Sequence, residues 1–165
     1  MIAVAAAVYA SIPAAKTVFS VAAASSKRKL PIYSVETDEK KVALSFDAAW
    51  GADDTETLLG ILKESNVKAT FFLCGYWVDK YPEEVKRIYE DGHDVGNHSN
   101  THPHGAQLSL EQNKSEITKV HEKLTALLGS GATVNLYRPP FGEYNDTVIE
   151  AAESLGYYAV QWDVE

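Results

Sequence analysis

Short apolar runs alternate with longer amphipathic stretches along most of the chain after residue 41. Apolar runs bounded by polar or turn-forming residues are typical of buried strands, and five occur at residues 42–46, 69–73, 94–96, 136–138 and 157–162. Strands that alternate with helices favour parallel βαβ units with right-handed crossovers. The pattern therefore predicts an α/β fold. Periodicity alone leaves open whether the sheet closes into a barrel or stays open and doubly wound.

Residues with strong preferences for helix ends lie between these strands. The predicted helices begin at or just after Asp53 or Asp54, Pro82, Ser109 and Asn145. Ser109 and Gln112 have the spacing of a capping box, and Pro82 favours the first turn of a helix. Because glycine adopts left-handed backbone angles readily, Gly92 and Gly156 predict two of the helix ends.

The first 24 residues differ in composition from the rest. Residues 2–15 are apolar apart from Tyr9 and Ser11, a length too short to span a bilayer but suited to an export signal. No basic residue precedes Ile2, so two interpretations remain: the remnant of a longer signal-anchor, or an Ala-rich leader. We expect an export or anchor segment at 1–24, a linker at 25–40 and one globular domain at 41–165. The protein is then secreted or membrane-anchored at the cell envelope.

Charge and cysteine content limit the partners. The formal net charge is −8 and no basic stripe occurs, so nucleic acid is not an expected partner. A neutral polymer such as an acetylated sugar suits an acidic protein better than an anionic polymer does. The single cysteine, Cys74, excludes an intrachain disulfide and a thiolate cluster, and its apolar neighbours predict a small core residue. We expect a monomer.

Two polar groups follow predicted strands, where the sites of α/β folds form. Asp47 ends the first strand, although it could instead cap the next helix. His98 and His102 are four residues apart, so one helical turn or a tight loop would aim both at one metal ion and leave room for water. The alternative is a solvated polar loop. His104 is an alternative second ligand.

The remaining histidines and a rigid turn complete the set of candidates. His93 and His121 are expected on the surface. Residues 138–142 read Arg-Pro-Pro-Phe-Gly, in which the prolines stiffen the backbone and the glycine permits a tight turn. Such a turn would fix Arg138 beside a carboxylate and present backbone N–H groups, such as that of Phe141, to a ligand. Alone, it would be a Pro-Gly turn with a surface arginine.

In this order, the three segments resemble the motifs of the NodB-homology polysaccharide deacetylases, carbohydrate esterase family 4. Asp47 matches the first aspartate of the family's T/S-F-D-D motif, and residues 98–102 match H-S/T-x-x-H. Residues 138–142 match R-P-P-Y/F-G, and residues 161–164 resemble the start of W-D-V-x-S-x-D-W. The resemblance covers about 41–165. Residues 46–51, Phe-Asp-Ala-Ala-Trp-Gly, further resemble sporulation-associated or cell-wall members from Firmicute-type bacteria, which carry an N-terminal membrane segment.

The resemblance implies a distorted (β/α) barrel and metal-assisted removal of N-acetyl groups from a cell-wall or chitin-like polysaccharide. It implies a divalent ion, usually zinc but sometimes cobalt or nickel, held by His98 and His102. Asp47 would be the general base and Arg138 would orient it. The Phe141 backbone N–H, next to Pro140 in the substrate-facing turn, would stabilise the oxyanion. A histidine near the C-terminus would protonate the leaving amine.

Two departures from the family pattern affect the expected activity. Ala48 occupies the position of the usual second aspartate, a metal ligand, and a methyl group cannot coordinate metal. The site would then rest on His98, His102, water and Asp47 itself; Asp53 or Asp54 could substitute, although helix capping explains them more simply. No histidine follows the last predicted strand, and the final barrel strands are absent, so we interpret the chain as part of a longer gene product with little activity alone. A non-catalytic glycan-binding envelope protein and an O-acetyl polysaccharide esterase are the alternative functions.

Overall fold

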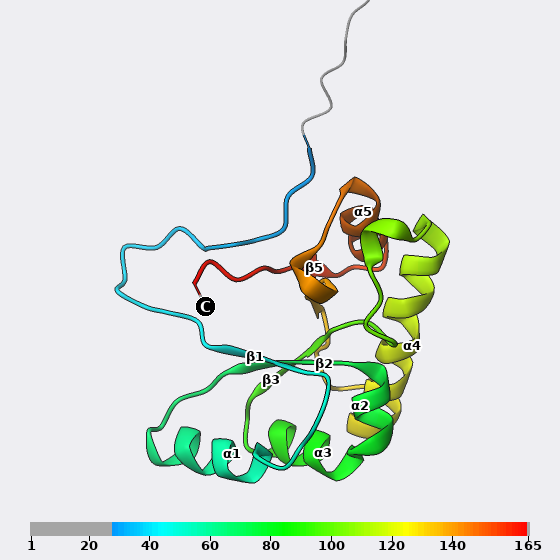
Figure 1. The fold of residues 1–165 in the computed structure, drawn as a ribbon. Helices are drawn as coiled ribbons and strands as arrows, with labels where there is room; N and C mark the ends of the chain where they lie inside the picture. Colours follow the sequence, from blue (N-terminus) through cyan, green and yellow to red (C-terminus); the bar gives the residue numbers. More distant parts are fainter. Residues whose placement is uncertain (1–27, 165) are drawn as a thin grey trace, which may run out of the picture.

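The computed structural model describes residues 28–164 and contains one five-stranded parallel sheet (Figure 1). Its strands are β1 (Ser45–Ala48), β2 (Thr70–Leu73), β3 (Asp94–Asn97), β4 (Leu136–Tyr137) and β5 (Tyr158–Ala159). The connections contain the helices α1 (Thr55–Glu64), α2 (Gly75–Lys80), α3 (Pro82–Glu90), α4 (Leu110–Leu128) and α5 (Asp146–Ser154). Two 3₁₀ turns, η1 (Gly105–Gln107) and η2 (Pro140–Gly142), complete them. The predicted α/β class is confirmed.

The strands lie in the sheet in the order in which they occur along the chain, β1 to β5. Right-handed crossovers between successive parallel neighbours place every helix on the same side, as in the wall of a (β/α) barrel. A doubly wound sheet would instead reverse its strand order. Figure 1 agrees, since the helices run along one side of the sheet and the segment before β1 lies on the other. The described part of the chain is therefore a five-stranded section of a singly wound sheet.

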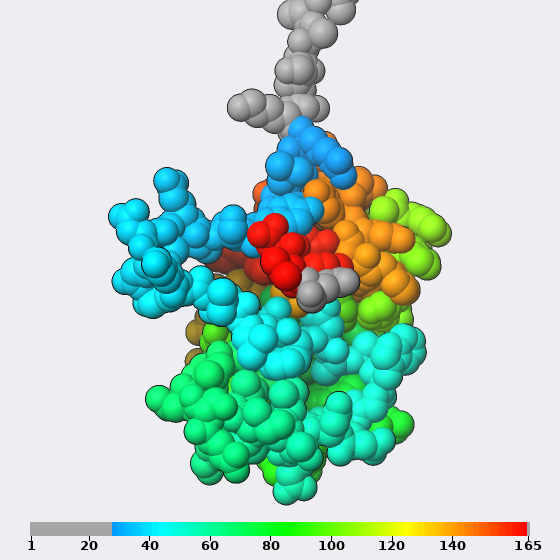
Figure 2. Space-filling model, turned by 60° about the vertical axis from the view of Figure 1, so that its left-hand side comes forward, coloured from blue at the N-terminus to red at the C-terminus, as the bar shows by residue number. Residues whose placement is uncertain are grey.

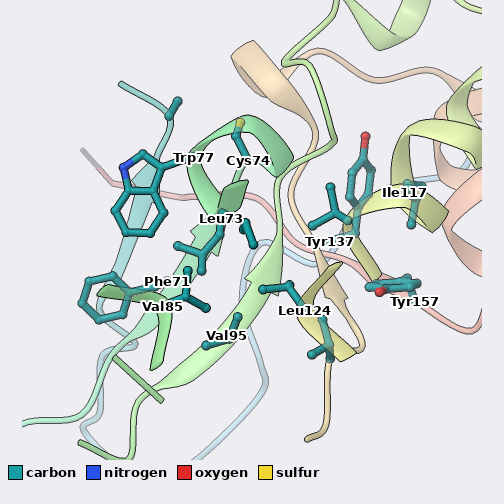
Figure 3. Close-up of a cluster of buried hydrophobic side chains, with 14 of the residues drawn as sticks. Phe71, Leu73, Cys74, Trp77, Val85, Val95, Ile117, Leu124, Tyr137 and Tyr157 are labelled. Carbon is teal, nitrogen blue, oxygen red and sulfur yellow. The ribbon is translucent and has the colours of Figure 1, made fainter. Parts of the chain in front are cut away.

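Alternate residues of the strands serve two different faces. Phe71, Leu73 and Val95 point toward the helices and are each no more than 4% exposed. They form part of the apolar cluster shown in Figure 3, which includes Trp77 from α2 and Leu124 from α4. The intervening residues point to the opposite, inner face of the sheet. The apolar core therefore occupies one face and leaves the other for chemistry.

The predicted helix ends are largely confirmed. Ser109 and Gln112 form both hydrogen bonds of the capping box before α4. The side chain of Asn145 accepts from the backbone N–H of Val148 at the start of α5. Gly92 follows α3 with a φ of +78°, which is the left-handed conformation that a helix end favours. Asp54 takes the N-cap position of α1, but its side chain makes no capping bond, so only its position was predicted correctly.

Two predicted strands had the wrong bounds, and one helix was not predicted. The first strand is Ser45–Ala48 rather than 42–46, and Val42 is 96% exposed because pairing with β2 begins only where Thr70 donates to the Leu44 carbonyl. The last strand is shorter than residues 157–162, although Val160 still pairs with Ile32. Helix α2 was not predicted, because it is only six residues long, is separated from β2 by one residue and has no side-chain cap.

His93 was predicted on the surface and is buried, with 4% exposure. Its Nδ1 accepts a hydrogen bond from the backbone N–H of Ala69 over 3.2 Å, and its ring packs against Phe71. The aromatic body of histidine fills core space when one ring nitrogen has a partner. By contrast, His121 is exposed as predicted, and Cys74 is fully buried as predicted.

The segment before β1 is attached to the domain by several contacts, of which two involve its backbone and residues near the C-terminal part of the sheet. Ile32 pairs in parallel with Val160, and the backbone N–H of Lys29 donates to the Asp146 carboxylate over 2.9 Å. The predicted export or anchor segment at 1–24 lies outside the described residues, as does the start of the 25–40 linker. Within 28–164, no helix has both the length and the apolar character needed to cross a membrane.

Candidate active site

Three polar residues sit one position beyond the ends of three neighbouring strands. Cys74, His98 and Arg138 directly follow the last residues of β2, β3 and β4. The backbone N–H of each donates to the carbonyl of the last residue in the preceding strand, over 2.9 to 3.0 Å. The sheet ladder thus fixes their backbones side by side at the carboxyl edge, where ligands bind in folds of this type.

Arg138 joins two residues of β1. Its Nη1 donates to Asp47 Oδ1 over 2.7 Å, and its Nη2 donates to Ser45 Oγ over 2.9 Å. Ser45 and Asp47 are two residues apart in a strand, so both side chains point to the inner face. The Arg138 side chain is 6% exposed and that of Asp47 is 31% exposed. The arginine is therefore a fixed, buried anchor for a carboxylate that still reaches the solvent.

The Arg138 guanidinium stacks on Phe72, and Gly96 leaves the space that the Phe72 ring occupies. Phe72 and Gly96 are opposite each other in β2 and β3. A Cβ atom added to Gly96 would lie 2.5 Å from a Phe72 ring carbon, so only glycine leaves space for the ring there. The Arg138 guanidinium carbon lies 4.0 Å from the Phe72 ring centre, a cation–π geometry.

His98 is oriented by the backbone of the same arginine. Its Nδ1 lies 2.7 Å from the Arg138 carbonyl oxygen, so Nδ1 carries the proton and Nε2 has a free lone pair. That Nε2 lies 3.7 Å from Asp47 Oδ2, the carboxylate oxygen not bound to Arg138. Burial lowers the pKa of His98, which favours the neutral imidazole that metals require.

A tight loop, rather than a helical turn, brings the His102 ring next to the His98 ring. Ser99 and His102 have φ values of +66° and +54°, and Ser99 Oγ accepts the His102 backbone N–H over 3.1 Å. The centres of the His98 and His102 rings are 5.0 Å apart. Burial lowers the pKa of His102 as well. The loop converges on one point, as a metal site needs, rather than exposing both rings to solvent.

Cys74 joins the two histidines, and the sequence interpretation missed it. One donor atom each from Cys74, His98 and His102 lie within 4.8 Å of one another. Two imidazoles and a thiolate are a donor set that zinc accepts. The pattern that marked the other residues, a polar side chain directly after a strand, would also have marked this cysteine. Without metal, burial raises the pKa of its thiol to about 12.

Other residues proposed for the metal are placed differently. The Ala48 methyl group packs against the apolar core and offers no donor atom. Within residues 28–164, neither Asp53 nor Asp54 belongs to the three-donor cluster. His104 Nδ1 instead lies 2.9 Å from the Glu143 carboxylate, and its ring stacks on Phe141 with 4.3 Å between ring centres.

The turn after β4 presents a free backbone donor beside the histidines. Phe141 has a φ of +58°, and its ring centre lies 4.5 Å from that of His102. The N–H groups of Gly142 and Glu143 bond to carbonyls within the turn, whereas that of Phe141 has no acceptor among residues 28–164. Pro140, at the start of the turn, is buried. The strained turn thus leaves one backbone N–H beside His102 without an acceptor in the described part of the chain.

Two hollows meet at Asp47. One, of about 520 Å³, is lined by residues around β1 and α1, including Trp50, and the other, of about 300 Å³, by Ser45, Arg138 and Trp162. Figure 2 shows the C-terminal residues in red beside the cyan residues around β1 on this face. Trp50 is 79% exposed, and its ring lies 6.0 Å from His102. Exposed aromatic rings around a carboxylate suit the apolar faces of a sugar.

Residues 34–160 match the family described as polysaccharide deacetylase. The chain is 37% identical to a peptidoglycan-N-acetylglucosamine deacetylase of Bacillus cereus, over 81% of this chain and 48% of the relative. It is 35% identical to a peptidoglycan-N-acetylmuramic acid deacetylase of Bacillus subtilis, over 80% of this chain and 50% of the relative. The chain thus spans about half the length of these curated relatives.

A solved structure with a similar fold comes from Bacillus anthracis. It is described as a pseudoenzyme of carbohydrate esterase family 4, shares 34% identity and superposes with a TM-score of 0.77. The match covers 82% of this chain and 47% of that one. A mutant of the same pseudoenzyme, described as having restored enzymatic activity, has a TM-score of 0.77 at 36% identity.

Proposed function

Because the chain belongs to the polysaccharide deacetylase family, we propose that it is part of an enzyme that hydrolyses N-acetyl groups on peptidoglycan sugars at a divalent metal site. One observation carries the proposal. A single carboxylate, that of Asp47, bonds through one oxygen to Arg138 and faces the His98 Nε2 through the other, 3.7 Å away. A base that is anchored on one side and free toward a metal-binding imidazole is what such hydrolysis requires.

The residues divide the chemistry between them. A bound zinc ion, or cobalt or nickel in its place, would supply Lewis acidity toward the acetyl carbonyl and lower the pKa of water. Asp47 Oδ2 accepts the proton of the attacking water, while Arg138 holds Oδ1 and so fixes the direction of the free lone pairs. The Phe141 N–H donates to the acetyl oxygen as negative charge develops there.

The substrate and the location follow from the relatives and the leader. Relatives are named for N-acetylglucosamine and N-acetylmuramic acid deacetylation in peptidoglycan. The exposed rings of Trp50 and Phe141 beside His102 would pack against the sugar faces. Since peptidoglycan lies outside the cytoplasmic membrane, we place the protein at the cell envelope, exported or anchored through residues 1–24. A role in sporulation is part of the same proposal.

Acetate release tests this function. The full-length gene product, loaded with zinc, is incubated with peptidoglycan, with N-acetylglucosamine oligomers and with O-acetylated xylan. Release from the first two and loss of release in Asp47→Asn support the proposal. Release from xylan alone would point to the O-acetyl esterase instead, and no release from any of the three would contradict both.

A non-catalytic role is the second candidate, favoured by two observations. Ala48 removes the family's usual carboxylate ligand, and the structurally similar Bacillus anthracis protein is a pseudoenzyme. In that case the protein would sediment with insoluble peptidoglycan and release no acetate. Ala48→Asp would then be expected to create activity in the full-length protein, whereas an active wild-type protein excludes this role.

A further inference from the structure

We propose that Cys74 is the third protein ligand of the metal site and takes over the role that Ala48 cannot perform. The inference rests on the proposed function in one respect, namely that a metal ion binds at His98 and His102. It goes beyond that function because it assigns a thiolate to a place where the family pattern has a carboxylate. In this proposal the thiolate of Cys74 compensates for the ligand that is missing at Ala48.

The distances fit a zinc centre. One donor atom each from Cys74, His98 and His102 lie within 4.8 Å of one another. Tetrahedral zinc, with bonds of about 2.3 Å to sulfur and 2.0 Å to nitrogen, separates its ligand atoms by about 3.5 Å. The three donor atoms would therefore have to approach one another by at most about 1.3 Å, the difference between 4.8 Å and about 3.5 Å. His98 already presents its free Nε2, because Nδ1 is held by the Arg138 carbonyl.

The backbone places Cys74 next to the position that lost its ligand. Ala48 pairs with Leu73, and the Cys74 N–H donates to the Ala48 carbonyl over 3.0 Å. Cys74 therefore lies beside Ala48 at the neighbouring strand end, and its side chain lies near His98 and His102, the two histidines that a carboxylate at position 48 would join. A deprotonated thiol carries the same charge as a carboxylate, so the ligand set keeps one negative charge and two neutral imidazoles.

Cys74 belongs to the buried apolar cluster, but its sulfur also contacts the histidine loop. In Figure 3 the Cys74 sulfur lies at the end of β2 and points away from Leu73 and Val85. Its hydrogen bond goes to the His98 carbonyl over 3.3 Å, within the histidine loop. Cys74 and His98 are buried, whereas His102 is partly exposed. A water molecule could then complete the coordination of the ion from the side of His102, as a catalytic zinc site needs.

The proposed centre has a chemical consequence. Binding breaks the S–H bond, forms a metal–sulfur bond and releases one proton to solvent. A thiolate is softer than a carboxylate, so the site should select zinc or cobalt against magnesium and manganese more strongly than an all-nitrogen-and-oxygen site does.

Cobalt spectroscopy tests the ligand directly, because Cys74 is the single cysteine of the chain. The full 165-residue chain is titrated anaerobically with Co²⁺. We expect a sulfur-to-cobalt charge-transfer absorption in the near ultraviolet that Cys74→Ser abolishes. Zinc affinity, from competition with a chromophoric chelator, should fall by at least about 100-fold in Cys74→Ala, the upper end of losses seen for outer-shell partners. His121→Gln, which removes an imidazole outside the cluster, should leave both measurements unchanged.

The double variant separates compensation from a general loss of folding. Ala48→Asp in the Cys74→Ala background should regain zinc affinity without the sulfur absorption. Cobalt bound by the wild type without that absorption would overturn the assignment, as would unchanged zinc affinity in Cys74→Ala. The absorption in a protein whose full-length form releases no acetate would uphold Cys74 as a ligand and contradict only the enzymatic proposal. No metal binding by either the wild type or Ala48→Asp would overturn both.

Discussion

The two carboxylate oxygens of Asp47 lie in different environments, and this division defines the site at the scale of single residues. Oδ1 is bound by the buried guanidinium of Arg138, and Oδ2 faces His98 Nε2. An oxygen held in a charge-assisted bond loses freedom to rotate. The second oxygen is therefore directed toward the cluster rather than sampling the groove.

Asp47→Asn separates proton transfer from structure. The amide oxygen can still accept from Arg138, so the fold and metal binding should remain close to wild type, but the amide cannot take a proton. Under the proposed function, acetate release by the full-length protein should fall by about 10²- to 10⁴-fold. The measurements are initial rates and thermal unfolding. A variant with wild-type rates would remove Asp47 from the reaction.

Arg138→Lys tests whether the forked guanidinium is needed. One ammonium cannot reproduce the two separate bonds to Asp47 and Ser45 together with the flat contact on Phe72. We expect the free energy of unfolding, measured with urea, to fall by about 1.5 to 3 kcal/mol, the range for bonds to charged groups. Lys63→Arg, on the last turn of α1, is the matched control and should change little. Equal stability in both variants would show that the fork is dispensable.

At the scale of elements, helices α1 and α5 offer a direct comparison of N-cap residues. Asn145 bonds to the Val148 N–H at the start of α5, whereas Asp54 occupies the same position in α1 without a side-chain bond. Asn145→Ala should therefore cost about 1 kcal/mol of folding stability. Asp54→Ala should cost distinctly less. Urea unfolding of the two variants measures both losses of folding stability. Equal losses would contradict the conclusion that only Asn145 caps its helix through the side chain.

Strand β3 depends on one glycine for its contact with β2. An alanine at Gly96 would meet the Phe72 ring at 2.5 Å, so Gly96→Ala should destabilise the fold by about 1 to 3 kcal/mol through overpacking. The Gly60→Ala control, in the middle of α1 where nothing lies within 4 Å, should raise stability by about 0.5 to 1 kcal/mol. If Phe72 is the cause, Phe72→Leu should partly rescue Gly96→Ala.

For the molecule as a whole, buried His93 makes stability depend on pH. Burial lowers its pKa below 6.5, and Lys68 adds to the effect while Asp91 and Asp94 oppose it. Between the lowered pKa and 6.5, the unfolded chain binds a proton that the native state does not, so stability rises with pH in that window. The contribution is complete above pH 6.5 and is lost progressively as pH falls below it.

His93→Asn should flatten this dependence, since the amide oxygen can accept the Ala69 N–H and does not titrate. Urea unfolding of both proteins between about pH 5 and 8 provides the comparison. His98 and His102 have lowered pKa values too and contribute with the same sign, so the difference between the two curves isolates His93. Parallel curves would contradict the assignment.

Much of this architecture could be predicted from sequence, because local signals act over a few residues. The Ser109 capping box, the Asn145 cap and the positions of the three middle strands needed no tertiary information. Helix α2 and the burial of His93 could not be predicted in this way, since each depends on distant partners: Trp77 donates to the Gly51 carbonyl, and His93 accepts from Ala69. Cys74 was missed because its apolar neighbours favoured a core position, although its place directly after a strand was the signal that marked the other site residues.

The separation of the two sheet faces has a consequence for how proteins of this kind change over evolutionary time. Residues that hold the fold together and residues that would act on a ligand alternate along the same strands and point to opposite faces of the sheet. A lineage can therefore lose its chemistry, or exchange one ligand for another, while the scaffold stays intact. The related pseudoenzyme and its mutant described as having restored enzymatic activity both superpose on this chain with a TM-score of 0.77, as such reversibility requires.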